Sequence, residues 1–299
     1  MKRSRLSLIA LAGAAALVLS ACSSSGDGAG SGSGGTGSGG GDDANPAVVS
    51  NPSFEAGTTM EKLSKAGKIT VGVKFDQPLF GEKGLKGEEG FDVEIAKIIA
   101  GQLGIAADKI DWKEAVSANR EPFIENGEVD IIVATYTIND KRKEVIDFAG
   151  PYYIAGQSLL VKADNNEIKS EKDIVGKPVC SVTGSTPAEN LAKLGAETVL
   201  TDTYSNCLEP LRSGKVVAVS TDNVILAGLA AKNEGEFKLA GDLFTEEPYG
   251  IGLKKGDTAF KDFINKTLED SYTDGAYKKA WDKTAGTILK FVDGPAITE

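Results

Sequence analysis

The stretch VDIIVATYTINDKR, residues 129–142, joins two parts of opposite chemistry. Its first five residues, 129–133, form a short apolar run that is typical of a buried strand. The residues that follow carry hydroxyl, amide and charged side chains as far as Arg142. In open α/β folds, ligands bind beyond the carboxyl ends of strands. The stretch therefore predicts a buried strand whose end carries a binding loop.

The same alternation continues outward from this stretch in both directions. On the N-terminal side, ITVGV at 69–73 is typical of a buried strand, and apolar residues recur at helical spacing over 91–103. On the C-terminal side, apolar runs at 178–182 and 216–219 alternate with helical patterns. Strands separated by helices indicate parallel α/β units.

The strand and helix series runs twice, once before and once after about residue 155. We therefore predict a two-lobed α/β fold. Lobe one is expected over 60–156 plus 247–299, and lobe two over 157–246. Facing lobes would bring their strand ends to opposite sides of a ligand cleft.

Residues 1–21 are typical of an export signal peptide. Basic residues come first, and the apolar run 8–19 is too short to span a bilayer. The Leu-Ser-Ala-Cys sequence that ends at Cys22 resembles a lipobox, in which the cysteine becomes the lipidated N-terminus. The alternative is an ordinary signal peptide followed by an incidental cysteine.

Residues 22–59 are expected to be the lipidated cysteine and a linker. The part from 23 to 41 consists almost entirely of Gly and Ser, which cannot bury a core. We expect this segment to tether the folded part to a membrane. The alternative is low-complexity sequence with no role.

The composition excludes several classes of function. The chain carries a formal charge of −10, which disfavours nucleic acid and anionic membranes as partners. An anionic ligand would need local basic groups. Because the chain has no histidine, Ser-His and Cys-His nucleophiles and histidine-based metal sites are excluded. We expect no metal and no cofactor.

Two cysteines remain once Cys22 is assigned to the anchor. Cys180 and Cys207 lie in a segment that we expect to be exported, which favours a disulfide between them. The alternative is a pair of unpaired buried thiols.

Three segments carry a resemblance to a known family. They are the Thr-x-Thr-x-x-x-x-Arg pattern at 135–142, the Asp-Phe-x-x-Pro-Tyr-Tyr pattern at 147–153, and GFDVE at 90–94. In combination they resemble the polar amino acid-binding receptors of ABC importers, solute-binding family 3, and among these the glutamate-binding lipoproteins. The resemblance covers about 62–286 and implies a two-lobed periplasmic-binding-protein-like fold of type II.

The resemblance implies roles at the end of the 129–133 strand. The matching arginine, Arg142, binds the ligand α-carboxylate, for which a guanidinium offers two parallel hydrogen bonds. Thr137 contacts the ligand backbone, and the 135–137 segment, including Thr135, offers further polar groups. The alternative for Arg142 is a solvated charge beside two lysines.

Lobe two is expected to supply the remaining backbone contacts. The family places its amine-binding aspartate at Asp222, although a helix N-cap is the simpler interpretation of that residue. Thr183 and Thr186 lie at a helix start, where N–H groups favour anions, and the resemblance puts them near the α-carboxylate. The alternative is helix capping alone.

The ligand side chain is expected to be acidic. Lys74 occupies a position where glutamine-binding relatives have an aspartate, and Arg120 resembles the arginine that acidic amino acid receptors direct at the side chain. Tyr204 resembles a further side-chain contact. The alternatives are surface charges and a packed tyrosine. The residue between 75 and 80 that would cover the ligand is left open.

The sequence thus predicts a non-enzymatic, monomeric lipoprotein on the outer face of the cytoplasmic membrane. It would bind glutamate or aspartate and deliver it to the permease of an ABC importer. Two alternatives stay open: a ligand sensor for a membrane kinase, and a dehydratase-like enzyme on the same fold.

Overall fold

The computed structural model describes residues 45–299. The predicted signal peptide, the lipidation of Cys22 and the Gly/Ser-rich part of the linker lie outside the described residues. Among the helices of residues 45–299, none is long and apolar enough to cross a membrane.

Lobe one is built on a five-stranded sheet in the order β5, β1, β6, β13, β7. The strand bounds are Ile110–Glu114 for β5, Ile69–Val73 for β1, Ile131–Ile132 for β6, Glu247–Lys254 for β13 and Ile146–Ala155 for β7. β1 pairs in parallel with β5 and β6, whereas β13 runs antiparallel to β6 and β7. The parallel part is the product of the strand and helix alternation seen in the sequence.

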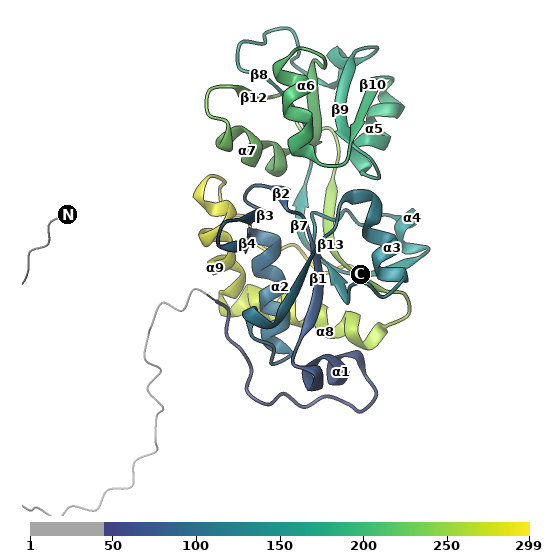
Figure 1. The fold of residues 1–299 in the computed structure, drawn as a ribbon, viewed down its shortest axis with the longest axis vertical. Helices are drawn as coiled ribbons and strands as arrows, with labels where there is room; N and C mark the ends of the chain where they lie inside the picture. Colours follow the sequence, from purple (N-terminus) through teal and green to yellow (C-terminus); the bar gives the residue numbers. More distant parts are fainter. Residues whose placement is uncertain (1–44) are drawn as a thin grey trace, which may run out of the picture. The chain divides into compact units, whose positions relative to one another are not determined.

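Helices cover both faces of this sheet. On one face α2 (Phe91–Gln102) packs against α8 (Thr258–Asp274) and α9 (Ala276–Lys283), while α3 (Arg120–Glu125) and α4 (Asp140–Lys143) lie on the other (Figure 1). The apolar side chains of α2 are buried, because the sheet and the two C-terminal helices enclose it.

Lobe two is built on a second five-stranded sheet in the order β10, β9, β11, β8, β12. The bounds are Glu197–Thr201 for β10, Pro178–Val182 for β9, Ala218–Asp222 for β11, Gln157–Lys162 for β8 and Phe237–Ala240 for β12. Its helices are α5 (Thr186–Leu194), α6 (Leu208–Arg212) and α7 (Asn223–Lys232). The expected two-lobed α/β architecture is therefore present.

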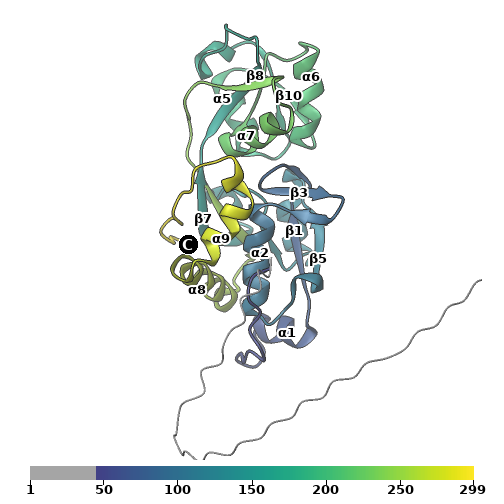
Figure 2. The same ribbon diagram turned by 90° about the vertical axis from the view of Figure 1, so that its left-hand side faces the viewer.

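Two neighbouring strands carry the chain between the lobes. β7 leads into β8 after the single residue Gly156, and the chain returns through β13. Figures 1 and 2 show β7 reaching from one lobe to the other. Lobe two is thus an insertion within lobe one, and we place the boundaries at 156 and 247 as a proposal.

The segment 45–58 packs on lobe one instead of leaving it as a linker. The N–H of Val49 donates to the carbonyl of Gly101 over 2.9 Å, and Phe54 meets Phe263 edge to face. A Cβ at Gly101 would lie 2.4 Å from the carbonyl oxygen of Ala47, so the missing side chain allows this approach. Helix α1 (Thr59–Ala66) follows at once.

A small three-stranded antiparallel sheet follows β1. It consists of β2 (Asp76–Gln77), β3 (Gly81–Gly84) and β4 (Gly87–Glu89), in that order. β2 approaches both α7 and the short 3-10 turn Tyr204–Cys207. The segment after the first strand therefore meets lobe two.

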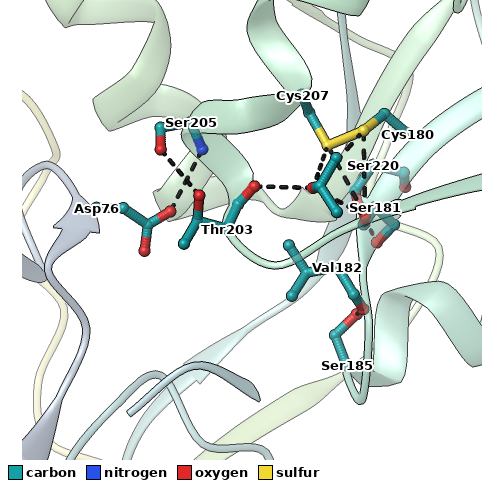
Figure 3. The surroundings of a disulfide bond; sticks show 10 residues. Asp76, Cys180, Ser181, Val182, Ser185, Thr203, Ser205, Cys207 and Ser220 are labelled. Carbon is teal, nitrogen blue, oxygen red and sulfur yellow. Dashed lines mark hydrogen bonds between the residues drawn. A yellow bond between two sulfur atoms is a disulfide. The ribbon is translucent and has the colours of Figure 1, made fainter. Parts of the chain in front are cut away.

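Cys180 and Cys207 form the disulfide expected from the sequence (Figure 3). Cys180 lies in β9, and Cys207 closes the 3-10 turn that begins at Tyr204. Both cysteines are fully buried. The bond ties the turn that carries Tyr204 to the central part of the second sheet.

Replacing both cysteines by alanine should lower the free energy of unfolding. The bond closes a loop with a sequence separation of 27, and chain entropy alone assigns about 3 kcal/mol to a loop of that size. Urea unfolding of the double variant beside the unaltered chain measures the difference. Equal unfolding free energies would show that the disulfide contributes no net stability.

Candidate functional site

The two sheets present their strand ends to each other around a small polar cavity. The cavity has a volume of about 10 Å³, which is room for about one water molecule. Both lobes contribute to its wall, which consists of Ser117, Arg120, Thr135, Thr137, Ser185, Thr186, Pro187, Tyr204, Asp222 and Ile225. The lobes are therefore in contact, and the cleft between them is closed.

The cavity brings together most of the residues that the sequence predicts for ligand binding. Six of them line it: Arg120, Thr135, Thr137, Thr186, Tyr204 and Asp222. Lys74 and Arg142 are buried but do not line it. Thr183 is exposed; its N–H donates to the Thr201 carbonyl over 3.0 Å, which extends the pairing of β9 with β10 and leaves the side chain outside.

Arg120 is held in place by backbone oxygens. It is 2% exposed, its Nε donates to the Ser117 carbonyl over 3.3 Å, and its Nη1 donates to the Ala134 carbonyl over 3.2 Å. The guanidinium lies 4.1 Å from the ring centre of Tyr136. Burial, and then the charge of Arg142, lower its pKa to about 10. The side chain is a fixed cation in the cavity wall.

Arg142 already uses its donors on three partners. Its Nη1 donates to the Thr137 carbonyl over 2.5 Å, its Nε to Glu121 over 3.1 Å, and its Nη2 to the Gly184 carbonyl over 3.1 Å. Glu121 is a partner that the sequence analysis missed. A ligand carboxylate would have to take over bonds that Glu121 and Gly184 now accept.

Lys74 is a buried amine with one hydrogen bond among the described residues. It is 3% exposed, and its Nζ donates to the Ser117 hydroxyl over 2.8 Å. Burial first, and then the charge of Arg120, hold its pKa well below the usual range. No carboxylate among the described residues forms an ion pair with Lys74 or Arg120, although Asp76 and Asp92 lie near enough to Lys74 to oppose part of the lowering of its pKa.

Asp222 is the last residue of β11, at the point where α7 begins. Asp222 occupies the N-cap position of α7, as the simpler interpretation expects, but its side chain makes no capping hydrogen bond. Oδ2 accepts from the Tyr249 hydroxyl over 2.6 Å, whereas Oδ1 is buried without a hydrogen-bond partner among the described residues. Burial, and then the charge of Glu247, raise its pKa to about 7.

Asp92 fixes the loop that carries Thr135. Thr135 has a φ of 44°, which is strained for a residue with a branched side chain. Asp92 accepts its N–H over 2.9 Å and the Tyr152 hydroxyl over 2.7 Å. The GFDVE segment points to Asp92 only as a family feature, so this role was missed.

Glu247 is a second acidic residue that the sequence analysis missed. It is 2% exposed, and its two oxygens accept from the hydroxyls of Thr186 over 2.7 Å and Thr245 over 2.8 Å. The Thr186 hydroxyl has one proton, which lies within reach of two acceptors: Glu247 at 2.7 Å and, further away, Thr137 Oγ1 at 3.3 Å. Glu247 and Thr137 are thus joined through Thr186, which belongs to the other lobe.

The arrangement suits a small molecule that carries both signs of charge. Asp222 offers an unpaired acceptor on one side, and Lys74 and Arg120 offer positive charge on the other. No group of three or more acidic, Cys or His side chains within residues 45–299 could hold a metal ion. The chemistry that these side chains offer is electrostatic recognition.

Comparisons with known proteins agree with this geometry. Residues 69–287 match the bacterial extracellular solute-binding proteins, family 3. The glutamate-binding protein GluB of Corynebacterium efficiens is 40% identical over 78% of this chain and 83% of its own length. The ABC transporter glutamine-binding protein GlnH of Bacillus subtilis is 41% identical over 75% of this chain and 84% of its own.

Solved structures give the same result for the fold. An ancestral arginine-binding protein bound to glutamine superposes with a TM-score of 0.69 at 36% identity, covering 73% of this chain and 97% of its own. A second ancestral amino acid-binding protein, a precursor of cyclohexadienyl dehydratase, has a TM-score of 0.69 at 28% identity and covers 76% and 99%. On sequence and fold together, this chain belongs to the bacterial extracellular solute-binding proteins of family 3.

Proposed function

We propose that the protein captures an acidic amino acid, glutamate above all, and delivers it to an ABC importer. The observation that carries the proposal is the buried Asp222 Oδ1, which has no donor among the described residues. A buried acceptor without a partner costs free energy, and a ligand ammonium would supply the missing donor and the missing charge.

The charges of the site favour a ligand with two carboxylates. A ligand ammonium would pair with Asp222, and its α-carboxylate would face Arg142, at the cost of the bond to Glu121. Lys74 and Arg120 would then remain for a second carboxylate. An acidic amino acid carries this set of charges, whereas glutamine would leave the two cations without a counter-ion.

The relatives support amino acid binding but do not decide between an acid and an amide. GluB is named for glutamate and GlnH for glutamine, at nearly the same identity to this chain. The preference for glutamate therefore rests on Lys74 and Arg120. Aspartate is the second candidate, since the same charges would recognise it.

The remaining parts of the proposal follow from the sequence and the family. The protein would be anchored through Cys22 to the outer face of the cytoplasmic membrane, would act as a monomer, and would dock to permease subunits. We propose no reaction: the relatives are named for binding, and the site requires only charge pairing.

Glutamate should bind more tightly than glutamine by tens to thousands of times. Leaving one member of a buried charge pair unmatched costs about 2–5 kcal/mol, which corresponds to about 30-fold to several thousand-fold in affinity. Arg120→Met should remove most of this preference, because the cation that faces the side chain is lost. Calorimetric titration of both amino acids against both proteins measures it.

Arg142→Met is the matched control for this experiment. It should weaken glutamate and glutamine alike, because both carry an α-carboxylate. If Arg120→Met weakens the two ligands equally, Arg120 does not recognise the side chain, and the assignment of an acidic ligand loses its main support.

Glutamate affinity should fall as the pH drops below about 7. The pKa of Asp222 is raised to about 7, so its ionised form, which the ammonium needs, becomes scarce below that value. The expected slope approaches tenfold per pH unit at the acidic end, and binding should release a proton there. Asp222→Asn should bind weakly with no such slope. A wild-type affinity that is flat from about pH 8 to about pH 5.5 would contradict the pairing.

The lobes should separate to admit the ligand and close on it. The present cavity holds about one water molecule, which is too little for an amino acid. Small-angle scattering should show a smaller radius of gyration with saturating glutamate than without it. A free protein that already has the compact radius and still binds glutamate at a diffusion-limited rate would contradict this picture.

A further inference from the structure

Within residues 45–299, the closed lobes touch each other on two sides of the cavity. On one side, the Arg142 bond to Gly184 is joined by an ion pair between Lys141 and Glu189 over 3.1 Å. On the other side, the loop after β1 meets helix α7. The second contact involves no residue that lines the cavity or that we assign to the ligand.

Gly228 makes the second contact possible. It lies inside α7, and a Cβ built at this position would be 2.3 Å from the carbonyl oxygen of Pro78 and 3.0 Å from its carbonyl carbon. Real Cβ atoms do not come within 3.0 Å of another heavy atom. The obstacle is backbone, which no side-chain rotation can move. Any side chain at 228 would therefore push α7 away from the loop.

Neighbouring contacts show that this is a shared face between the lobes. Lys232, one turn further along α7, forms an ion pair with Glu82 of β3. Asp76 of β2 accepts the N–H of Ser205 over 3.3 Å, and Figure 3 shows the two residues reaching toward each other. The loop 75–80, where the sequence left the ligand cover open, thus docks on lobe two.

We propose that Gly228 determines ligand affinity without touching the ligand. Its missing side chain lets α7 dock on Pro78, and this contact exists only when the lobes are closed. The inference rests on the proposed function, because it is through closure that the contact would change affinity. In an open protein the two backbones are apart, so a methyl group at 228 meets nothing.

Helix propensity makes the effect separable from a folding defect. Alanine is a better residue than glycine inside a helix, so Gly228→Ala should leave the free protein at least as stable as before. Crowding in the closed state should nevertheless weaken glutamate binding by about 5-fold to about 100-fold, as extra methyl groups in packed contacts do. We therefore expect Gly228→Ala to bind glutamate more weakly while the thermal stability of the free protein is unchanged or higher.

Two comparison variants test whether crowding at position 228 is the cause of the weaker glutamate binding. Gly184→Ala also adds a Cβ between the lobes, 2.8 Å from Ala118 Cα, but Gly184 has a φ of 76°, so this variant should lose stability as well. Lys232→Ala removes the exposed ion pair on the same face without adding bulk. It should change affinity by less than about threefold, since such pairs contribute little.

The test uses the full chain and three measurements on each variant. These are calorimetric titration with glutamate, the scattering radius with and without saturating glutamate, and the midpoint of thermal unfolding without ligand. For Gly228→Ala we expect weaker binding, a larger radius at equal glutamate concentration and an unchanged or higher midpoint. Wild-type affinity and radius would overturn the inference, and so would a midpoint that falls in proportion to the lost binding.

The two proposals fail in different ways. If the wild-type chain binds glutamine and no acidic amino acid, the acidic ligand of the proposed function fails, and glutamine replaces glutamate in the same three measurements. Weaker glutamine binding and a larger radius at equal glutamine concentration for Gly228→Ala would then support the closure contact, and wild-type values would reject it.

Discussion

The antiparallel pairing of β7 with β13 is the constraint on which the rest of the structure depends. The two strands pair from Glu247 opposite Ala155 to Lys254 opposite Ile146, and they are the route by which the chain enters and leaves lobe two. They also carry the hydroxyls that hold the two buried aspartates: Tyr152 reaches Asp92, and Tyr249 reaches Asp222. The pair that joins the lobes thus also sets the polar groups beneath the cavity.

Burying the charged groups of the site costs free energy, and a bound ligand of opposite charges would lower that cost. Arg120 and Arg142 lie 4.1 Å and 4.9 Å from the same Tyr136 ring, whose negative faces offset part of their repulsion. Lys74 adds a third basic group, whose pKa is lowered by burial, and the pKa of Asp222 is raised to about 7. Groups that are strained, charged and rigid before binding need little rearrangement afterwards, which is the physical basis of preorganised recognition.

The sequence correctly predicted those parts of the structure that depend on the local pattern of apolar and polar residues. The alternation of strands and helices gave the two α/β lobes, and the polar segment after the 129–133 run does lie at a strand end. The sequence did not predict hydrogen-bond partners that come from distant segments, such as Glu121 for Arg142 and Glu247 for Thr186. Nothing near those residues in the sequence marks them, because only the tertiary fold brings them together. Thr183 shows a different limit. A sequence pattern that marks the start of a helix does not indicate which of its hydroxyl side chains points into the cleft, and Thr183 is exposed.

Both ends of the described chain belong to lobe one. The segment 45–58 packs against α2 and α8, and the N–H groups of Thr298 and Glu299 donate to the Gly150 carbonyl in β7. Lobe two is therefore held at both ends by lobe one and contains neither end of the described segment. A fluorescent label or surface attachment at either end of the described segment, near residue 45 or residue 299, would report on lobe one alone. A sensor built on this scaffold would need its second dye within lobe two, where the exposed residue Asn166, which does not line the cavity, offers a place.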